Sequence, residues 1–139
     1  MKRKRFILLF CITLFVLSSV VVQAEVKKRT VIIDQGHGQK FVIEKEGDLQ
    51  LSGLSGLFKG KGYDVKVNAG QINDAALKTA DALLISGAFQ SLSAEETDVV
   101  IRFIERGGKL CVMLHMPQPL TGLMGRLKVY ASYVVMQEQ

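Results

Sequence analysis

The chain has two histidines, and each follows a short apolar run that could form a strand. His37 lies in Asp34-Gln35-Gly36-His37-Gly38-Gln39, directly after Val31-Ile32-Ile33. A carboxylate, two amides and an imidazole could bind a polar ligand, hold a metal ion or exchange protons. Parallel α/β sheets bind their ligands beyond the carboxyl ends of the strands. The residues expected in such a binding cleft are Asp34, Gln35, His37, Gln39, Ser86 and His115.

A purely structural role for both histidines is the alternative. His37 would then cap a turn, and His115 would pack beneath the loop that carries Pro117. Histidine is often used in this way, so a single histidine at a strand end does not establish a catalytic site.

The apolar runs alternate with helical patterns, which is typical of parallel strands joined by crossover helices. The predicted strands are 31–34, 63–68, 82–86, 109–114 and 129–136. The predicted helices are 73–79, 93–106, 120–127 and one that Asp48 caps and Gly60 ends. We expect a flavodoxin-like, three-layer α/β sandwich with a mainly parallel sheet of order 2-1-3-4. Because the chain stops within three residues of the last strand, a sheet that is incomplete at the C-terminus is an open alternative.

Two local features bear on chemistry. Ser93 and Glu96 have the spacing of a capping box at the start of a helix. The run 109–114 is continuously apolar, as expected for a parallel strand that is buried on both faces. Cys111 lies in the middle of that run, so we expect a buried, protonated and inert thiol rather than a nucleophile.

Residues 1–24 have the pattern of an export signal. Lys2-Arg3-Lys4-Arg5 precedes the apolar run 6–22, and Val22-Gln23-Ala24 is a cleavage pattern that predicts a mature chain from Glu25. An uncleaved membrane anchor over 6–22 is the alternative. Either case predicts an extracytoplasmic protein, in the periplasm or at the cell surface, with one α/β domain over residues 25–139.

Most of the excess positive charge belongs to this signal. It contains four of the 18 basic residues and none of the 13 acidic ones, which leaves 14 against 13, a net charge of +1. The basic isoelectric point is therefore no evidence for a nucleic-acid partner. The partners expected instead are a small ligand or an envelope protein.

The segment Val31-Ile32-Ile33-Asp34-Gln35-Gly36-His37-Gly38 resembles the start of the zinc-dependent N-acetylmuramoyl-L-alanine amidases, which cut peptidoglycan. That resemblance implies zinc as cofactor, with His37 as one ligand and Glu44 or Glu46 as another. The family places a second histidine ligand after a strand that resembles 80–86, where this chain has Gly87 and Ala88. Catalytic zinc usually has three protein ligands, so this function is kept as the alternative.

Over residues 30 to 130, the chain resembles the bacterial domain of unknown function 4350 family. The motifs that carry this resemblance are Asp34-Gln35-Gly36-His37-Gly38-Gln39-Lys40-Phe41, 81–87, Leu92-Ser93-Ala94-Glu95-Glu96 and 103–110. The resemblance implies a class I glutamine-amidotransferase-like fold with no established activity. True amidotransferases have a nucleophilic cysteine after a strand like 110–114, whereas this chain has Met113 at about that position.

The expected function is therefore a non-catalytic binding module of the cell envelope. We expect no catalytic residues and no cofactor. A zinc-dependent peptidoglycan amidase with His37 and Glu46 as metal ligands is the alternative.

Overall fold

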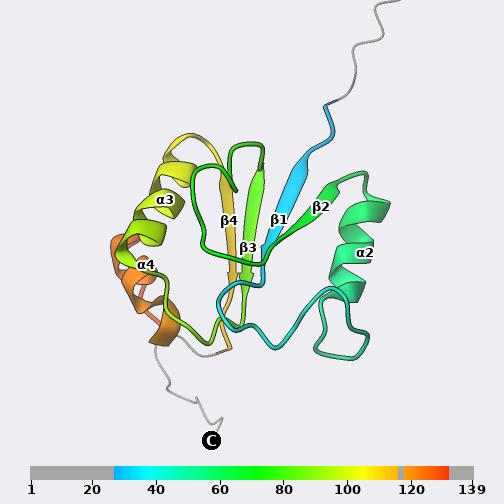
Figure 1. Ribbon diagram of the computed structural model, residues 1–139, viewed down its shortest axis with the longest axis horizontal. Coiled ribbons are helices and arrows are strands. Elements are labelled where there is room, and N and C mark those ends of the chain that lie inside the picture. Colours follow the sequence, from blue (N-terminus) through cyan, green and yellow to red (C-terminus); the bar gives the residue numbers. More distant parts are fainter. Residues whose placement is uncertain (1–26, 116–117, 132–139) are drawn as a thin grey trace, which may run out of the picture.

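The computed structural model describes residues 27–115 and 118–131, which form four parallel strands and the helices that connect them. The strands are β1 (Thr30–Asp34), β2 (Asp64–Asn68), β3 (Ala82–Ser86) and β4 (Lys109–Met113). They are arranged in the order β2-β1-β3-β4, with β1 pairing in parallel to both β2 and β3 (Figure 1). The α/β fold and the predicted order 2-1-3-4 are confirmed.

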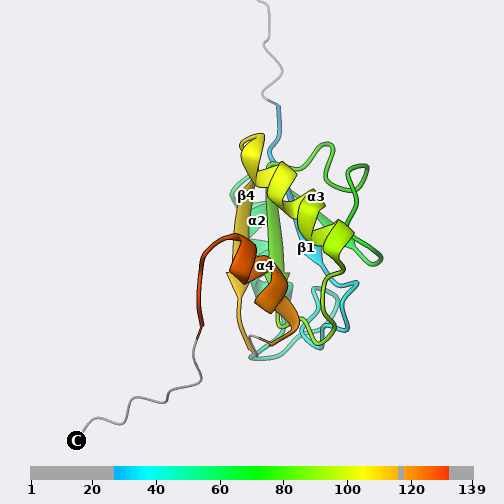
Figure 2. The same cartoon turned by 90° about the vertical axis from the view of Figure 1, so that its left-hand side faces the viewer.

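Helices cover the two faces of the sheet in separate layers (Figure 2). Helix α2 (Ser52–Gly60) lies on one face, whereas α3 (Ala94–Glu105) and α4 (Thr121–Arg126) lie on the other. A short 3-10 helix, η1 (Gln118–Leu120), leads into α4. This three-layer arrangement is flavodoxin-like.

Each strand contributes alternate side chains to the two cores, because successive residues of a strand point to opposite faces. Ile32 and Leu83 point toward α3 and pack in a cluster with Phe103 of that helix. Ile33 and Leu84 point the other way, into a smaller cluster with Leu51 before α2. Residues of β1 are buried on both faces, as expected for a central parallel strand.

Helix α3 begins with the predicted capping box. The Ser93 hydroxyl accepts a hydrogen bond from the Glu96 N–H at 3.1 Å, and the Glu96 carboxylate accepts one from the Ser93 N–H at 2.9 Å. Helix α2 begins differently from the prediction: its N-cap is Leu51, which makes no side-chain cap bond, and Asp48 lies in the loop before it. The predicted cap at Asp48 is therefore wrong.

Two further predicted elements differ from the structure. Residues 74–79 of the predicted helix 73–79 are turns rather than a helix. After one helical bond, from the Leu77 N–H to the Asn73 carbonyl at 3.2 Å, the N–H groups of Lys78 and Ala80 bond to carbonyls three residues back. Residues 129–131 of the predicted last strand are not in a strand, and the rest of that segment lies outside the described residues. The predicted export signal, 1–24, also lies outside them.

The expected burial of β4 on both faces is wrong. Cys111 pairs in register with the buried Leu84, so its side chain is on the face that α2 covers, yet Cys111 is exposed. Helix α2 lies next to β2, at the other side of the sheet from β4 (Figure 1). The predicted burial of the Cys111 thiol is therefore wrong.

Within residues 27–115 and 118–131, no helix is long and apolar enough to cross a membrane.

Candidate functional site

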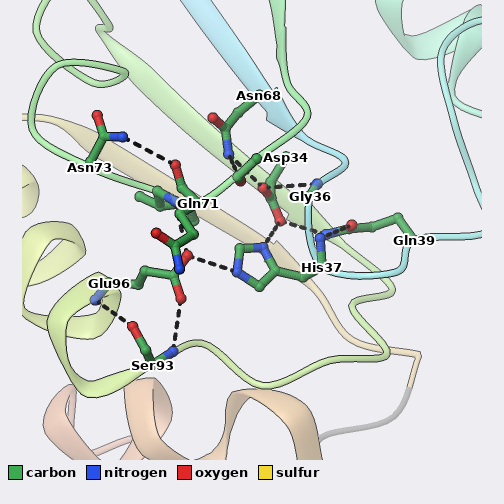
Figure 3. Close-up of polar contacts among 11 residues, drawn as sticks. Asp34, Gly36, His37, Gln39, Asn68, Gln71, Asn73, Ser93 and Glu96 are labelled. Carbon is green, nitrogen blue, oxygen red and sulfur yellow. Dashed lines mark hydrogen bonds and ion pairs between the residues drawn. The ribbon is translucent and has the colours of Figure 1, made fainter.

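Asp34, the last residue of β1, is at the centre of a buried polar cluster (Figure 3). Its side chain is fully buried. One carboxylate oxygen, Oδ1, accepts hydrogen bonds from Asn68 Nδ2 at 3.0 Å and from the Gly36 N–H at 3.4 Å. The other, Oδ2, accepts from Gln39 Nε2 at 2.5 Å and from the imidazole of His37 at 2.8 Å.

His37 lies between two carboxylates. Its Nδ1 is 2.8 Å from Oδ2 of Asp34, and its Nε2 is 3.0 Å from Oε1 of Glu96. The histidine side chain is only 6% exposed, and those of the two acids are 0% and 8% exposed. Both nitrogens of the ring are therefore engaged inside the protein.

Glu96 brings the start of α3 to this cluster. Its Oε1 also accepts a hydrogen bond from the Ile72 N–H at 2.9 Å, while its Oε2 accepts from the Ser93 N–H. One carboxylate thus completes the capping box, holds the loop after β2 and pairs with the histidine. We call the side chains of Asp34, His37, Gln39, Asn68 and Glu96 the Asp34 cluster.

The hydrogen bonds of the cluster favour one charge state. All four carboxylate oxygens of Asp34 and Glu96 face donors such as backbone N–H and amide NH₂ groups, which can only donate. An ionised carboxylate accepts all of these bonds, and the imidazole then donates from both nitrogens. His37 as an imidazolium between two carboxylates satisfies every one of these bonds.

The electrostatics agree with this assignment. The hydrogen bond to Asp34 raises the pKa of His37 above its ordinary value of 6.5; burial opposes this, and the charges of Asp34 and Glu96 reinforce it. Burial also acts to raise the pKa of Glu96, but hydrogen bonds from the backbone N–H groups of Ser93 and Ile72 outweigh it. With the charge of His37, they lower the pKa of Glu96 below 4.5. The N-terminus of α3 adds to this, because its dipole favours negative charge.

Glycine is required where the loop after β1 approaches the loop after β2. A Cβ atom on Gly36 would lie 2.2 Å from the carbonyl oxygen of Gly70, which is backbone and cannot rotate away. Gly38 has a φ of +70°, which is in the left-handed region. These glycines let the chain turn so that His37 points back toward Asp34.

A cavity of about 440 Å³ opens beside the cluster. His37 and Glu96 form part of its wall, and exposed polar side chains form much of the rest. The lining residues are Gly36, His37, Gln71, Gln90, Ser91, Leu92, Ser93 and Glu96. We call this cavity the strand-end pocket.

The structure brings together three of the six predicted cleft residues, Asp34, His37 and Gln39. Gln35 belongs to the adjoining loop, where it accepts a hydrogen bond from the Ile43 N–H at 2.8 Å and donates to the carboxylate of Glu44. Of these four residues, only His37 lines the strand-end pocket.

Ser86 and His115 lie apart from the hydrogen bonds of this cluster. Ser86 is buried at the end of β3. The His115 ring packs against Phe41 and Phe89, with ring centroids 5.5 and 6.1 Å away. The structure thus places His115 in an aromatic contact.

The two metal ligands expected in the alternative function, His37 and Glu46, lie in different surroundings. Both nitrogens of His37 point at carboxylates, whereas a metal ligand needs one free lone pair. Glu46 is exposed in the loop before α2. Within the described part of the chain, no group of three or more His, Cys, Asp or Glu side chains is arranged to hold a metal ion.

Sequence reasoning missed Asn68 and the second role of Glu96. Asn68 ends β2, and since β2 neighbours β1, its position beside Asp34 follows from the strand order. The capping-box pattern identified Glu96, but its contact with His37 joins residues 59 positions apart. No local pattern reports a contact of that kind.

No family model matches the chain. No curated protein matches it either. Among solved structures, the chain is similar to one described as "mmIFT52 N-terminal domain", with a TM-score of 0.55 and 16% sequence identity. The similarity covers 61% of this chain and 35% of that one, so this chain spans well under half of its length. At this identity, the likeness shows the α/β fold alone.

Proposed function

We propose that this protein is a non-catalytic binding module of the bacterial cell envelope, exported by its N-terminal segment. In this proposal it is a relative of the domain of unknown function 4350 family, with a class I glutamine-amidotransferase-like domain. The order of the sequence motifs supports the relationship, and the apolar run 6–22 supports export.

The observation that carries the proposal is the engagement of both His37 nitrogens by carboxylates. A general base needs a free lone pair that can accept a proton, and a nucleophile needs such a base within reach. An imidazolium held at 2.8 and 3.0 Å by two buried acids offers neither. The cluster instead orders the three loops that surround the strand-end pocket.

The chemistry of the pocket favours a small, uncharged polar ligand. Gln71, Gln90 and Ser91 are exposed at the pocket and offer both donors and acceptors. His37 and Glu96 are the charged side chains of the pocket wall, and together with the buried Asp34 they have a net charge of −1, which disfavours an anionic ligand. A small number of fixed hydrogen-bonding groups of this kind is enough to hold an uncharged polar ligand.

A thermal-shift screen of the purified chain against neutral polyols, amides and short peptides tests this proposal. A ligand that occupies the pocket raises the melting temperature in a saturable way, by mass action. Gln90→Ala should abolish that shift, whereas Gln118→Ala, which changes an exposed glutamine on η1, should leave it intact. A shift that survives Gln90→Ala would place the ligand elsewhere, and the absence of any shift across the screen would count against the binding module.

The zinc amidase is the outcome that would replace this proposal. It predicts stoichiometric zinc in the purified protein and release of peptides from peptidoglycan. It also predicts that His37→Ala removes the metal. Zinc bound with His37 as ligand would require the imidazole to leave at least one of its two carboxylate partners.

A further inference from the structure

The end of the sheet at which the strands begin, opposite the Asp34 cluster, has a dense group of cationic side chains. Lys27, Lys28, Arg29 and Lys61 line a depression of about 310 Å³ beside the start of β1. Arg29 also lines a second depression, of about 330 Å³, with Lys78, Arg106 and Lys109. We call this surface, formed by the seven side chains, the basic edge. All seven residues are exposed.

Few acidic groups compensate this charge. Asp81 is the one acidic residue that lines either depression, and its Oδ2 accepts a hydrogen bond from the Thr30 N–H at 2.7 Å. Within the described ranges, Arg106 is the one member of the seven with a carboxylate oxygen inside 4.0 Å, that of Asp74 at 3.8 Å. The basic edge therefore has unneutralised positive charge.

The opposite end of the sheet, beyond the carboxyl ends of the strands, has more acidic side chains. The loop after β1 contains Glu44, Glu46 and Asp48 against Lys40 and Lys45, and the first turn of α3 adds Glu95, all of them exposed. With a net charge of only +1 after residue 24, charge is segregated along the strand direction rather than in excess overall. Such a domain orients itself in front of a charged surface.

The path of the chain identifies that surface. Residues 27–29 lead into β1 at the basic edge, where the turns before β2 and β4 also lie (Figure 1). The apolar run 6–22 ends five residues before Lys27. Five extended residues span at most about 18 Å, so a bilayer that holds this run lies close to the basic edge.

We propose that the run 6–22 stays uncleaved as a membrane anchor and that the basic edge docks on the anionic headgroups of the phospholipid bilayer, so that the strand-end pocket faces away from the membrane. This docking does not depend on what the pocket binds. The basic edge is covalently continuous with the apolar run, which favours a membrane over a nucleic acid as the anionic partner. This link places the basic edge and the bilayer within contact range without a further binding event.

Lysine acylation of the full chain in nanodiscs tests the proposal, because the chain contains lysines at both edges. The discs contain phosphatidylcholine alone or with one third phosphatidylglycerol, the reagent is uncharged, and mass spectrometry reads each lysine. Phosphatidylglycerol should slow the acylation of Lys61, Lys78 and Lys109 about threefold or more, and high salt should reverse this. Lys40 and Lys45, in the loop at the other edge, should react equally in both discs.

Charge reversal provides the matched control. Lys61→Glu with Lys109→Glu should remove the protection of Lys78, whereas Lys40→Glu with Lys45→Glu should preserve it. Equal acylation in both kinds of disc would overturn the proposal, as would equal protection of Lys40 and Lys45. Stronger protection of the basic edge by an oligonucleotide than by phosphatidylglycerol would overturn it in favour of a nucleic-acid partner.

Discussion

Glu96→Gln removes one negative charge from the Asp34 cluster while it preserves the size of the side chain. We expect it to lower the free energy of unfolding by about 3 kcal/mol. Glutamine has one carbonyl oxygen, whereas the two oxygens of Glu96 accept from Ile72, Ser93 and His37. At least one buried donor is therefore left facing an NH₂ group.

The magnitude follows from two costs. An unsatisfied buried donor costs about 1–3 kcal/mol. Removal of one partner from a buried ion pair costs about 3–5 kcal/mol, and the lower end applies here because His37 keeps Asp34 at 2.8 Å. A loss of about 3 kcal/mol lowers the melting temperature of a domain of this size by more than about 10 °C.

Urea unfolding at neutral pH, followed by circular dichroism, measures this loss. Glu95→Gln is the matched control, because it removes the same charge from the same first turn of α3 but at an exposed position. It should cost no more than about 1 kcal/mol, the contribution of one charge at a helix terminus. If the unfolding free energies of the two variants differed by less than about 0.5 kcal/mol, the assignment of a buried ionic cluster would be wrong.

Three further predictions concern the same domain. Because the folded pKa of His37 is raised and that of Glu96 lowered, the unfolding free energy should be highest at intermediate pH. It should fall as pH rises through the folded pKa of His37 and as pH falls through that of Glu96. Urea midpoints from about pH 2 to about pH 9 would show this, and a flat profile would contradict it. Gly36→Ala should destabilise the fold by about 1–3 kcal/mol, because its Cβ meets a backbone carbonyl oxygen. Gly53→Ala, in open space on α2, should instead stabilise it by up to about 1 kcal/mol. Equal melting temperatures of the two variants would refute this contrast. Cys111 should react with a thiol reagent in the native protein at nearly the rate seen in urea, and strong native protection would show that its face of the sheet is covered.

Much of the fold could be predicted because its signals are local. The β3 strand has the predicted bounds, Ala82–Ser86, and the capping box at Ser93 and Glu96 marks the start of α3. Predictions failed where tertiary structure decides. The exposure of Cys111 depends on how far α2 extends across the sheet, which the apolar run 109–114 does not encode.

Three of the six residues predicted for the candidate site, Asp34, His37 and Gln39, lie together, but their hydrogen bonding could not be predicted. Ligands of parallel α/β sheets bind beyond the carboxyl ends of the strands, and this rule correctly placed Asp34 and His37 together at that end of the sheet. It could not show that Glu96 would reach His37, because that contact depends on how the start of α3 is placed over the sheet edge. Without that contact, a free imidazole and a buried imidazolium look the same in sequence.

The central position of β1 also determines when the fold can be completed during synthesis. β1 is made first, yet it pairs with β2 on one side and with β3 on the other. Its buried residues, 31–33, therefore have no strand neighbour until the chain has been made as far as Asn68, and lack the second one until Ser86. Until then, the nascent chain presents an apolar strand with one or both hydrogen-bonding edges free, which is a template for aggregation and a target for a chaperone.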